Sequence, residues 1–191
     1  MVYDGVSILQ CPRRGRKGLI FMSHEKRRLR EREFVALTRE LLDSDQVRMM
    51  GRWKHHGPVT TLDHSLFVAF STYRLARLLH LDVRSAVRGA LLHDLYLYDS
   101  RDKSAHPGSQ CFDHPRFAAR NAAALTPLTP KERNIILSHM WPLGGALPRS
   151  LEAWMVDLVD TVCAGLEISR ICRPSRLRDR LGVRPLVPVC Q

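Results

Sequence analysis

The stretch GALLHDLYLYD, residues 89–99, decides how this sequence is interpreted. It continues an apolar helical pattern that opens at Asp82, and it interrupts that pattern with His93 and Asp94. Burying an ionised carboxylate without a partner costs several kcal/mol, so Asp94 requires a cation, an arginine or hydrogen bonds. The partners of this doublet must come from elsewhere in the chain.

The sequence on both sides of this stretch is helical almost throughout, and it predicts an all-α fold. Apolar residues recur at helical spacing, and signals such as Gly57-Pro58 and Thr129-Pro130 separate the segments. No run of alternating β-branched residues is long enough to require a sheet. The predicted helices cover residues 25–42, 45–51, 61–80, 82–98, 115–125, 131–140 and 150–169. A turn-rich loop is expected over residues 99–112, with Asp113 as the cap of the helix that follows.

The charge of the chain lies mainly at its ends. Its 191 residues carry 30 Lys and Arg against 19 Asp and Glu, a net charge of +11. Residues 51–167 contribute only +2 of this excess. The length suits one domain, which we place at residues 30–170. A partly disordered basic extension, 1–29, and an extended or disordered proline-containing tail, 171–191, are expected to flank it. Such basic ends favour contact with nucleic acid.

The five cysteines show no metal or disulfide pattern. They stand at positions 11, 111, 163, 172 and 190, without a C-x-x-C pair. No apolar run approaches the roughly 20 residues that a membrane span requires. The apolar stretch that follows the basic N-terminal residues is too short for the core of a signal peptide. We therefore expect free thiols, no membrane segment and a cytoplasmic location.

Histidine is the informative residue type. Five of the nine histidines stand near predicted helix ends, in turns or on apolar helices, namely His56, His64, His93, His114 and His139. Asp160 also interrupts an apolar helix. A divalent metal would satisfy buried carboxylates together with neutral imidazoles, and helical bundles hold such ions between facing helices. The sequence therefore predicts a metal site between helices.

The local context of these residues resembles the HD-domain superfamily of metal-dependent phosphohydrolases. His64 lies in LDHSLFVA, the doublet lies in LLHD and Asp160 lies in VDLVDT. These four positions follow the order H, HD, D of that family. The resemblance covers about residues 50–168 and implies an all-α HD-type helical bundle with a metal site between its helices.

Two further histidines match HD proteins that bind two metals. His114 in DHPRF and His139 in LSHMW fall between the doublet and the last aspartate. Related two-metal sites occur in bacterial HD proteins that split dinucleoside polyphosphates and, in altered form, in inositol oxygenase. HD-GYP phosphodiesterases carry adjacent histidines at the later position, whereas Met140 follows here and the GYP motif is absent. Activity on cyclic di-GMP is not supported.

The resemblance implies one or two divalent ions and assigns their ligands. The implied ligands are His64, His93, Asp94, His114, His139 and Asp160, with Asp94 bridging to the second ion. Mn, Fe, Co, Ni or Zn suits imidazole and carboxylate ligands, and Mg is also open. Metal-bound hydroxide would then attack phosphorus, which gives His93 and Asp94 a catalytic role. The implied substrate is a phosphorylated small molecule, with a nucleotide as first choice.

Five residues near these positions are candidates for binding the substrate: His56, Arg101, Lys103, Arg116 and Arg120. Guanidinium forks match phosphate geometry. His55 and His56 precede the Gly57-Pro58 turn, and one of the two is expected to line the substrate pocket. An exposed role for each of these side chains stays open.

Two other functions fit the same residues. A di-iron oxygenase of the inositol-oxygenase type would keep the metal and change the chemistry. A non-catalytic helical module would keep the ligands for structure and bind nucleic acid or an acidic partner through its basic ends. The sequence leaves the oligomeric state open.

Overall fold

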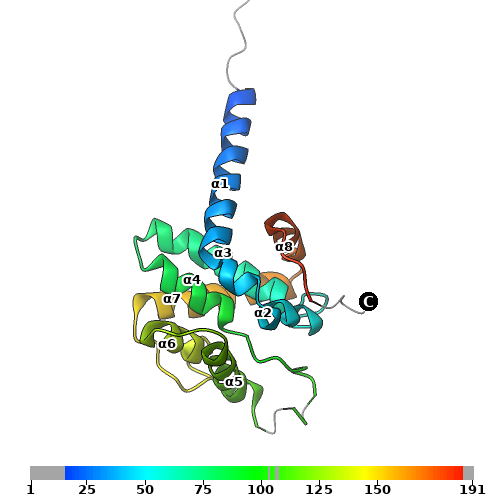
Figure 1. The fold of residues 1–191 in the computed structure, drawn as a ribbon, viewed down its shortest axis with the longest axis vertical. Helices are drawn as coiled ribbons and strands as arrows, with labels where there is room; N and C mark the ends of the chain where they lie inside the picture. Colours follow the sequence, from blue (N-terminus) through cyan, green and yellow to red (C-terminus); the bar gives the residue numbers. More distant parts are fainter. Residues whose placement is uncertain (1–15, 103, 106–107, 187–191) are drawn as a thin grey trace, which may run out of the picture.

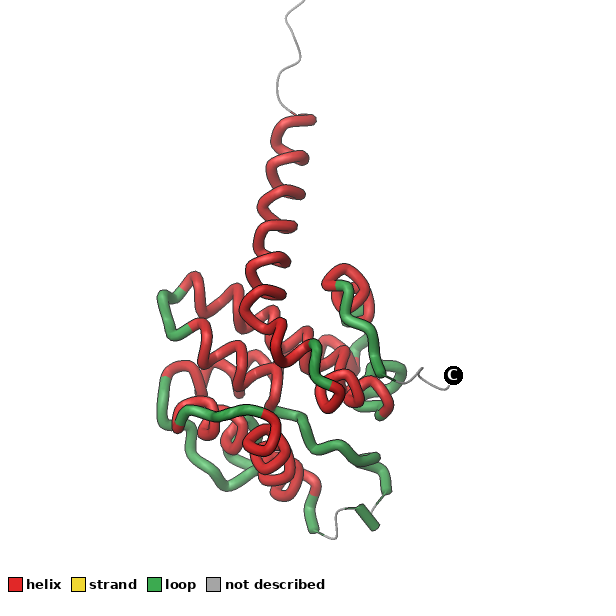
Figure 2. The backbone as a smooth tube through the Cα atoms, in the orientation of Figure 1, coloured by secondary structure: helices red, strands yellow, loops and turns green. Residues whose placement is uncertain are grey.

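The computed structural model of the protein describes residues 16–102, 104–105 and 108–186, and its regular structure is entirely helical (Figure 2). The prediction of an all-α fold is confirmed. In chain order the elements are α1 (Arg16–Leu42), α2 (Asp45–Met49), the 3₁₀ turn η1 (Met50–Arg52), α3 (Thr61–Leu78), α4 (Val83–Leu92), α5 (Gln110–Leu125), α6 (Pro130–Ser138), α7 (Leu151–Ile168) and α8 (Ser175–Leu181). Within the described residues, β pairing is limited to one isolated bridge between Lys54 and Thr60.

The core forms where α3, α4, α6 and α7 pack on one another, and α5 lies against α6. The second half of α1 contributes Phe34, Leu41 and Leu42 to this core. Its first half projects from the body of the molecule (Figure 1), and residues 24–30 are exposed. The helix begins nine residues before the predicted start at Glu25. Residues 1–15 of the predicted N-terminal extension lie outside the described residues.

The start of α3 is determined by a capping box. The Thr60 hydroxyl accepts a hydrogen bond from the Asp63 amide at 3.1 Å, and the Asp63 carboxylate accepts one from the Thr60 amide at 3.4 Å. Such reciprocal bonds satisfy two helix donors that otherwise have no partner. They fix the first turn of α3, and therefore the position of His64, which is 1 % exposed.

The helix predicted over residues 82–98 is shorter than expected. α4 ends at Leu92, and His93 is its C-cap. The chain then turns, with Leu97 at a φ of 56°, and the Asn121 side chain donates a hydrogen bond to the Leu95 carbonyl at 2.7 Å. Leu95 is fully buried outside the helix. Tertiary packing therefore overrides a local apolar pattern that would also suit a longer helix.

The predicted cap at Asp113 is also wrong. The cap is Ser109, four residues earlier, so that α5 begins at Gln110 and Pro115 lies inside the helix. A proline suggests the first turn of a helix because it lacks an amide donor, and this signal placed the start too late. The connection between α4 and α5 therefore begins at His93 and ends at Ser109.

The C-terminal tail is not extended or disordered where the structure describes it. Residues 175–181 form α8, and Leu177 and Leu181 are buried. Arg178 Nη1 lies 3.0 Å from the Asp63 carboxylate. The Leu186 amide donates to the Arg48 carbonyl at 3.1 Å. Two leucines one turn apart among arginines are too short a pattern for a helix prediction, and only the contact with α3 reveals their role.

The sequence also predicts free thiols and no membrane segment. Cys111, Cys163 and Cys172 are free, and the other two cysteines lie outside the described residues. Among the described helices, none combines the length and the apolar character that crossing a bilayer requires.

Candidate metal centre

Six buried side chains from five helices meet at one point. They are His64 in the first turn of α3, His93 and Asp94 at the end of α4, His114 on α5, His139 at the end of α6 and Asp160 in the middle of α7. Each was predicted from the sequence as a ligand, and the structure brings all six together. The convergence arises because α4 and α6 end where α3 begins to cross α7.

Asp94 is the centre of this cluster. Its two carboxylate oxygens face two different groups of histidines. Oδ2 lies 3.5 Å from His93 Nε2, 3.7 Å from His55 Nδ1 and 3.9 Å from His64 Nε2, whereas Oδ1 lies 3.4 Å from His114 Nε2 and 3.6 Å from His139 Nε2. Burial raises the pKa of Asp94, but the positive charges that His93, His55, His114 and His139 carry when protonated outweigh burial and hold that pKa below its usual range. A carboxylate placed in this way can bridge two cations.

Three histidines are held in one tautomer by backbone carbonyls. The Nδ1 atoms of His93, His114 and His139 lie 2.7, 2.6 and 2.8 Å from the carbonyl oxygens of Ala90, Gln110 and Ile136. A carbonyl oxygen only accepts hydrogen bonds, so each Nδ1 carries the proton. In the neutral ring, each Nε2 atom directs a lone pair at the cluster, as in metal-ligating histidines whose other nitrogen is held by the protein.

When the rings are neutral, the described structure offers these Nε2 atoms no hydrogen-bond donor. His93 Nε2 is buried without a hydrogen bond. His114 Nε2 lies 2.8 Å from His139 Nε2, so two acceptors face each other. Burial, followed by the charges of His93 and His114, lowers the pKa of His139 to about 3, which keeps that ring neutral. A divalent cation beside these nitrogens would remove both conflicts, and the residues therefore fit a metal site.

His64 is bound differently from the other three histidines. Its Nδ1 lies 3.0 and 3.1 Å from the two oxygens of Glu167, and its Nε2 lies 2.8 Å from Asp160 Oδ1. Burial lowers the pKa of His64, but the hydrogen bonds with the two carboxylates outweigh burial and raise that pKa well above its ordinary value. In the protonated ring both N–H groups donate. A metal ion would take the place of the Nε2 proton.

Glu167 was not predicted as a site residue. It is 3 % exposed, and its carboxylate holds Nδ1 of His64. A sequence signal was available, because Glu167 follows Asp160 by seven residues and two helical turns return a side chain to nearly the same face. A carboxylate that orients a ligating histidine is a frequent feature of metal sites.

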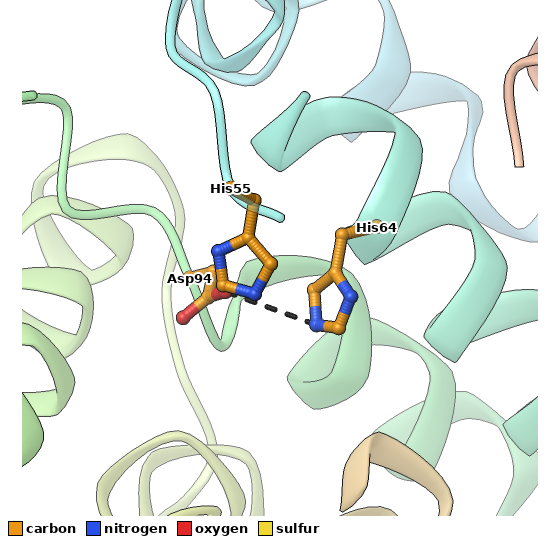
Figure 3. A group of neighbouring side chains, drawn as sticks. All are labelled: His55, His64 and Asp94. Carbon is orange, nitrogen blue, oxygen red and sulfur yellow. Dashed lines mark ion pairs between the residues drawn. The ribbon is translucent and has the colours of Figure 1, made fainter. Parts of the chain in front are cut away.

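His55 is the second residue that the ligand prediction missed. It lies in the turn between η1 and α3, where its amide donates to the Val59 carbonyl at 2.8 Å. Figure 3 shows His55 beside His64 and Asp94. Potential ligand atoms of these three residues lie within 4.8 Å of one another. Two further groups with the same property are His64, His93 and Asp160, and His93, Asp94 and His139.

A pocket of about 520 Å³ opens onto the cluster. Its wall includes the predicted substrate residue His56, and also Tyr96, Gln110, Trp141 and Ile168. Such a volume is typical of small-molecule sites. Within the described residues, neither arginine nor lysine lines this pocket. The negative charge of a phosphorylated ligand would therefore meet bound metal ions rather than protein cations.

The other substrate candidates lie elsewhere. Arg101 is 69 % exposed and binds both oxygens of Asp99 at 3.1 Å. Arg116 is exposed on α5, and the guanidinium of Arg120 lies 4.9 Å from the centre of the Phe117 ring. Lys103 lies outside the described residues. The structure thus brings His56 to the pocket and leaves the three arginines outside its wall.

The comparisons with known proteins follow this geometry. The family model described as HD domain matches residues 61–165, which is more than half of the chain. Searches of curated proteins and of solved structures give no match. The matched segment runs from the start of α3 to the last turns of α7. It contains all six predicted ligands and excludes His55 and Glu167.

Proposed function

This chain belongs to the HD-domain family, and from that premise we propose that it is a metal-dependent phosphohydrolase. Its substrate in this proposal is an ester or anhydride of a phosphorylated small molecule, with a nucleotide as first choice. One observation carries the proposal, namely the inward-facing Nε2 atoms of His93, His114 and His139 around the Asp94 carboxylate, of which that of His93 is buried without a hydrogen bond.

The proposed ligand sets follow the two sides of Asp94. One ion would be held by His64, His93, Asp94 and Asp160, with His55 as a further ligand. A second ion would be held by His114, His139 and the other oxygen of Asp94. Imidazole and carboxylate together suit Mn, Fe, Co, Ni or Zn, and Mg stays open.

When bound, divalent ions lower the pKa of water towards neutrality and neutralise charge on phosphate oxygens. The chain's own residues would position the substrate. His56, Tyr96 and Trp141 offer ring surfaces in the pocket wall, and a nucleobase fits such surfaces by stacking. Tyr96 stays protonated, because burial and the charge of Asp94 raise its pKa far above its ordinary value. The Tyr96 hydroxyl can therefore donate a hydrogen bond. Its oxygen lies 3.3 Å from the Thr61 hydroxyl oxygen.

Metal analysis combined with product analysis tests this proposal. Protein purified without a histidine tag is expected to contain stoichiometric divalent metal, and Asp94→Ala is expected to lose it. Wild type loaded with each candidate metal should release phosphate or a nucleoside phosphate from a nucleotide panel without consuming oxygen. A metal-free wild type that also stays inactive after loading would contradict the proposal. Iron with oxygen consumption and no phosphate release would favour the di-iron oxygenase instead.

The basic surface suggests nucleic acid as a second partner, independent of the pocket. A groove between α1 and α8 is lined by Arg27, Arg28, Arg32, Arg39 and Arg180, with Glu31 as its only acidic lining residue within the described part of the chain. Glu31 pairs with Arg180 at 3.0 Å and lies 3.9 Å from Arg27. The other three arginines keep their charge available for phosphates, whose neutralisation releases counterions. This groove supports the hypothesis that the basic ends of the chain contact nucleic acid. The C-terminal end takes part as a folded helix, α8, and not as a disordered tail.

A further inference from the structure

Helix α7 carries an apolar surface on its outer side. Among the described residues, eight of the thirteen exposed large hydrophobic side chains lie between positions 143 and 171. They are Leu143, Leu147, Leu151, Trp154, Leu158, Val162, Ile168 and Ile171, with exposed fractions of 45 to 74 %. Exposed apolar side chains that gather in one patch mark interaction sites.

The exposed residues of α7 form one stripe along the helix. Leu151, Trp154, Leu158, Val162 and Ile168 recur at spacings of three, four and six residues, and the exposed positions between them are Thr161 and Gly165. No exposed position of α7 carries a charge. The opposite side of the same helix is buried in the core. A helix that is apolar on both sides is normally buried on both sides by other protein or by a membrane.

Two pairs of positions in the stripe are complementary in size under a two-fold rotation. An antiparallel pair of α7 helices centred between positions 159 and 160 places Leu151 beside Ile168 of the partner subunit. The same register places Trp154 beside Gly165 of the partner subunit, and a side chain added at Gly165 meets no atom within 4 Å in this structure. Trp154, the bulkiest residue of the stripe, thus faces Gly165, which has no side chain. Such a match of large and small residues allows two helices to pack closely.

We propose that the outer face of α7 binds a second copy of this chain in a two-fold symmetric, antiparallel arrangement. Symmetric dimers use the same surface patch on both subunits, which the stripe provides. Side chains of this size at these exposures present roughly 80–100 Å² each. The five of the stripe give on the order of 450 Å² per copy. The three that flank α7 in the chain, Leu143, Leu147 and Ile171, raise this to about 700 Å², close to the roughly 800 Å² per partner of a standard interface.

The proposed interface also borders the pocket. Thr161, Gly165 and Ile168 belong both to the stripe and to the pocket wall. The second copy would therefore form part of the mouth of the pocket above the metal ligands. The inference rests on the exposed face of α7 and holds whether or not the site hydrolyses phosphates.

Light scattering and sedimentation of the full chain test this proposal. Wild type is expected to change from monomer to dimer over a roughly hundredfold range of concentration around the micromolar affinities of weak interfaces. Leu158→Lys, which places two like charges near the two-fold axis, is expected to give a monomer. Leu78→Lys on α3, at a position 72 % exposed, is the matched control and should leave the dimer intact. Circular dichroism should show unchanged helix content in both variants.

A second variant tests the register. Gly165→Leu fills the space assigned to Trp154 of the partner subunit, so it is expected to raise the dissociation constant at least tenfold without loss of helix. A wild type that stays monomeric throughout the range overturns the proposal. So does a dimer that survives Leu158→Lys. Monomeric wild type that floats with vesicles of anionic phospholipid would assign the stripe to a membrane surface, which also overturns the second-copy proposal.

Discussion

The Nε2 atoms of His114 and His139 lie 2.8 Å apart, and each ring, when neutral, donates its only N–H to a backbone carbonyl on the other side. Two lone pairs therefore face each other in a buried position. Proteins rarely leave buried polar atoms without partners. The two rings come from α5 and α6, and carbonyl contacts within each segment orient them, so the arrangement is built into the fold and calls for a cation.

Metal binding is expected to stabilise the protein. Adding Mn²⁺ or Zn²⁺ to metal-free protein should raise the melting temperature, because an ion that binds only the folded state adds about 2.7 kcal/mol at one hundred times its dissociation constant. Differential scanning fluorimetry measures the shift. Asp94→Asn should abolish it, because both proposed ions share this carboxylate. An equal shift in Asp94→Asn would place the bound metal elsewhere.

Glu167→Gln is expected to weaken metal binding by about 10- to 100-fold, because losing an orienting carboxylate has this effect in metal sites. Its carboxylate holds Nδ1 of His64 at 3.0 and 3.1 Å. Titration calorimetry of metal-free protein gives the affinity. The exposed Glu25→Gln on α1 is the control and should bind like wild type. Unchanged affinity in Glu167→Gln would show that His64 is oriented by packing alone.

Arg178→Ala is expected to lower the free energy of unfolding by about 2 kcal/mol, because it leaves the buried Asp63 carboxylate without its ion-pair partner. Arg178 Nη1 lies 3.0 Å from that carboxylate and connects α8 to the first turn of α3. Urea unfolding measures the change. Arg176→Ala, on the exposed side of α8, should stay within about 0.5 kcal/mol of wild type. Equal effects of the two variants would contradict the proposed role of Arg178.

The stability of metal-free protein is expected to fall between about pH 4 and pH 6 because of Asp157. Burial, followed by the charge of Asp160, raises its pKa to about 6 in the folded protein. The folded state therefore binds the proton more tightly than the unfolded state, and this contribution is lost as the pH rises through 6. Asp157→Asn should flatten that part of the curve in the presence of EDTA. An unchanged slope would show that the carboxylate is solvated.

The affinity for duplex nucleic acid is expected to depend less steeply on salt when Arg28→Ala is combined with Arg32→Ala. The negative slope of log affinity against log salt should become smaller in magnitude by about 2, because two phosphate contacts are lost. Fluorescence anisotropy at several salt concentrations measures this slope. Arg84→Ala with Arg133→Ala, both exposed outside the groove, removes the same charge and should leave the slope unchanged. Equal slopes for the two double variants would assign the binding to overall charge.

Much of the fold follows from local patterns. The capping box at Thr60 and Asp63 and the similar one at Thr129 and Glu132 start α3 and α6 close to the predicted positions. The end of α4 and the start of α5 were misplaced because both are determined by packing between distant segments. α8 was missed because its helix depends on Leu177 and Leu181 contacting the core.

The sequence by itself determined the all-α class and the six histidines and aspartates of the centre, because residue type and order are written along one chain. Only the tertiary structure decided that the Nε2 atoms of these histidines meet at one point, since they come from helices that are far apart in the sequence. It also brought in His55 and Glu167 and left the three arginine candidates outside the pocket wall. The exposed apolar face of α7 is likewise known only from the structure. The sequence shows that the helix is apolar, but it does not show whether one side or both sides are buried.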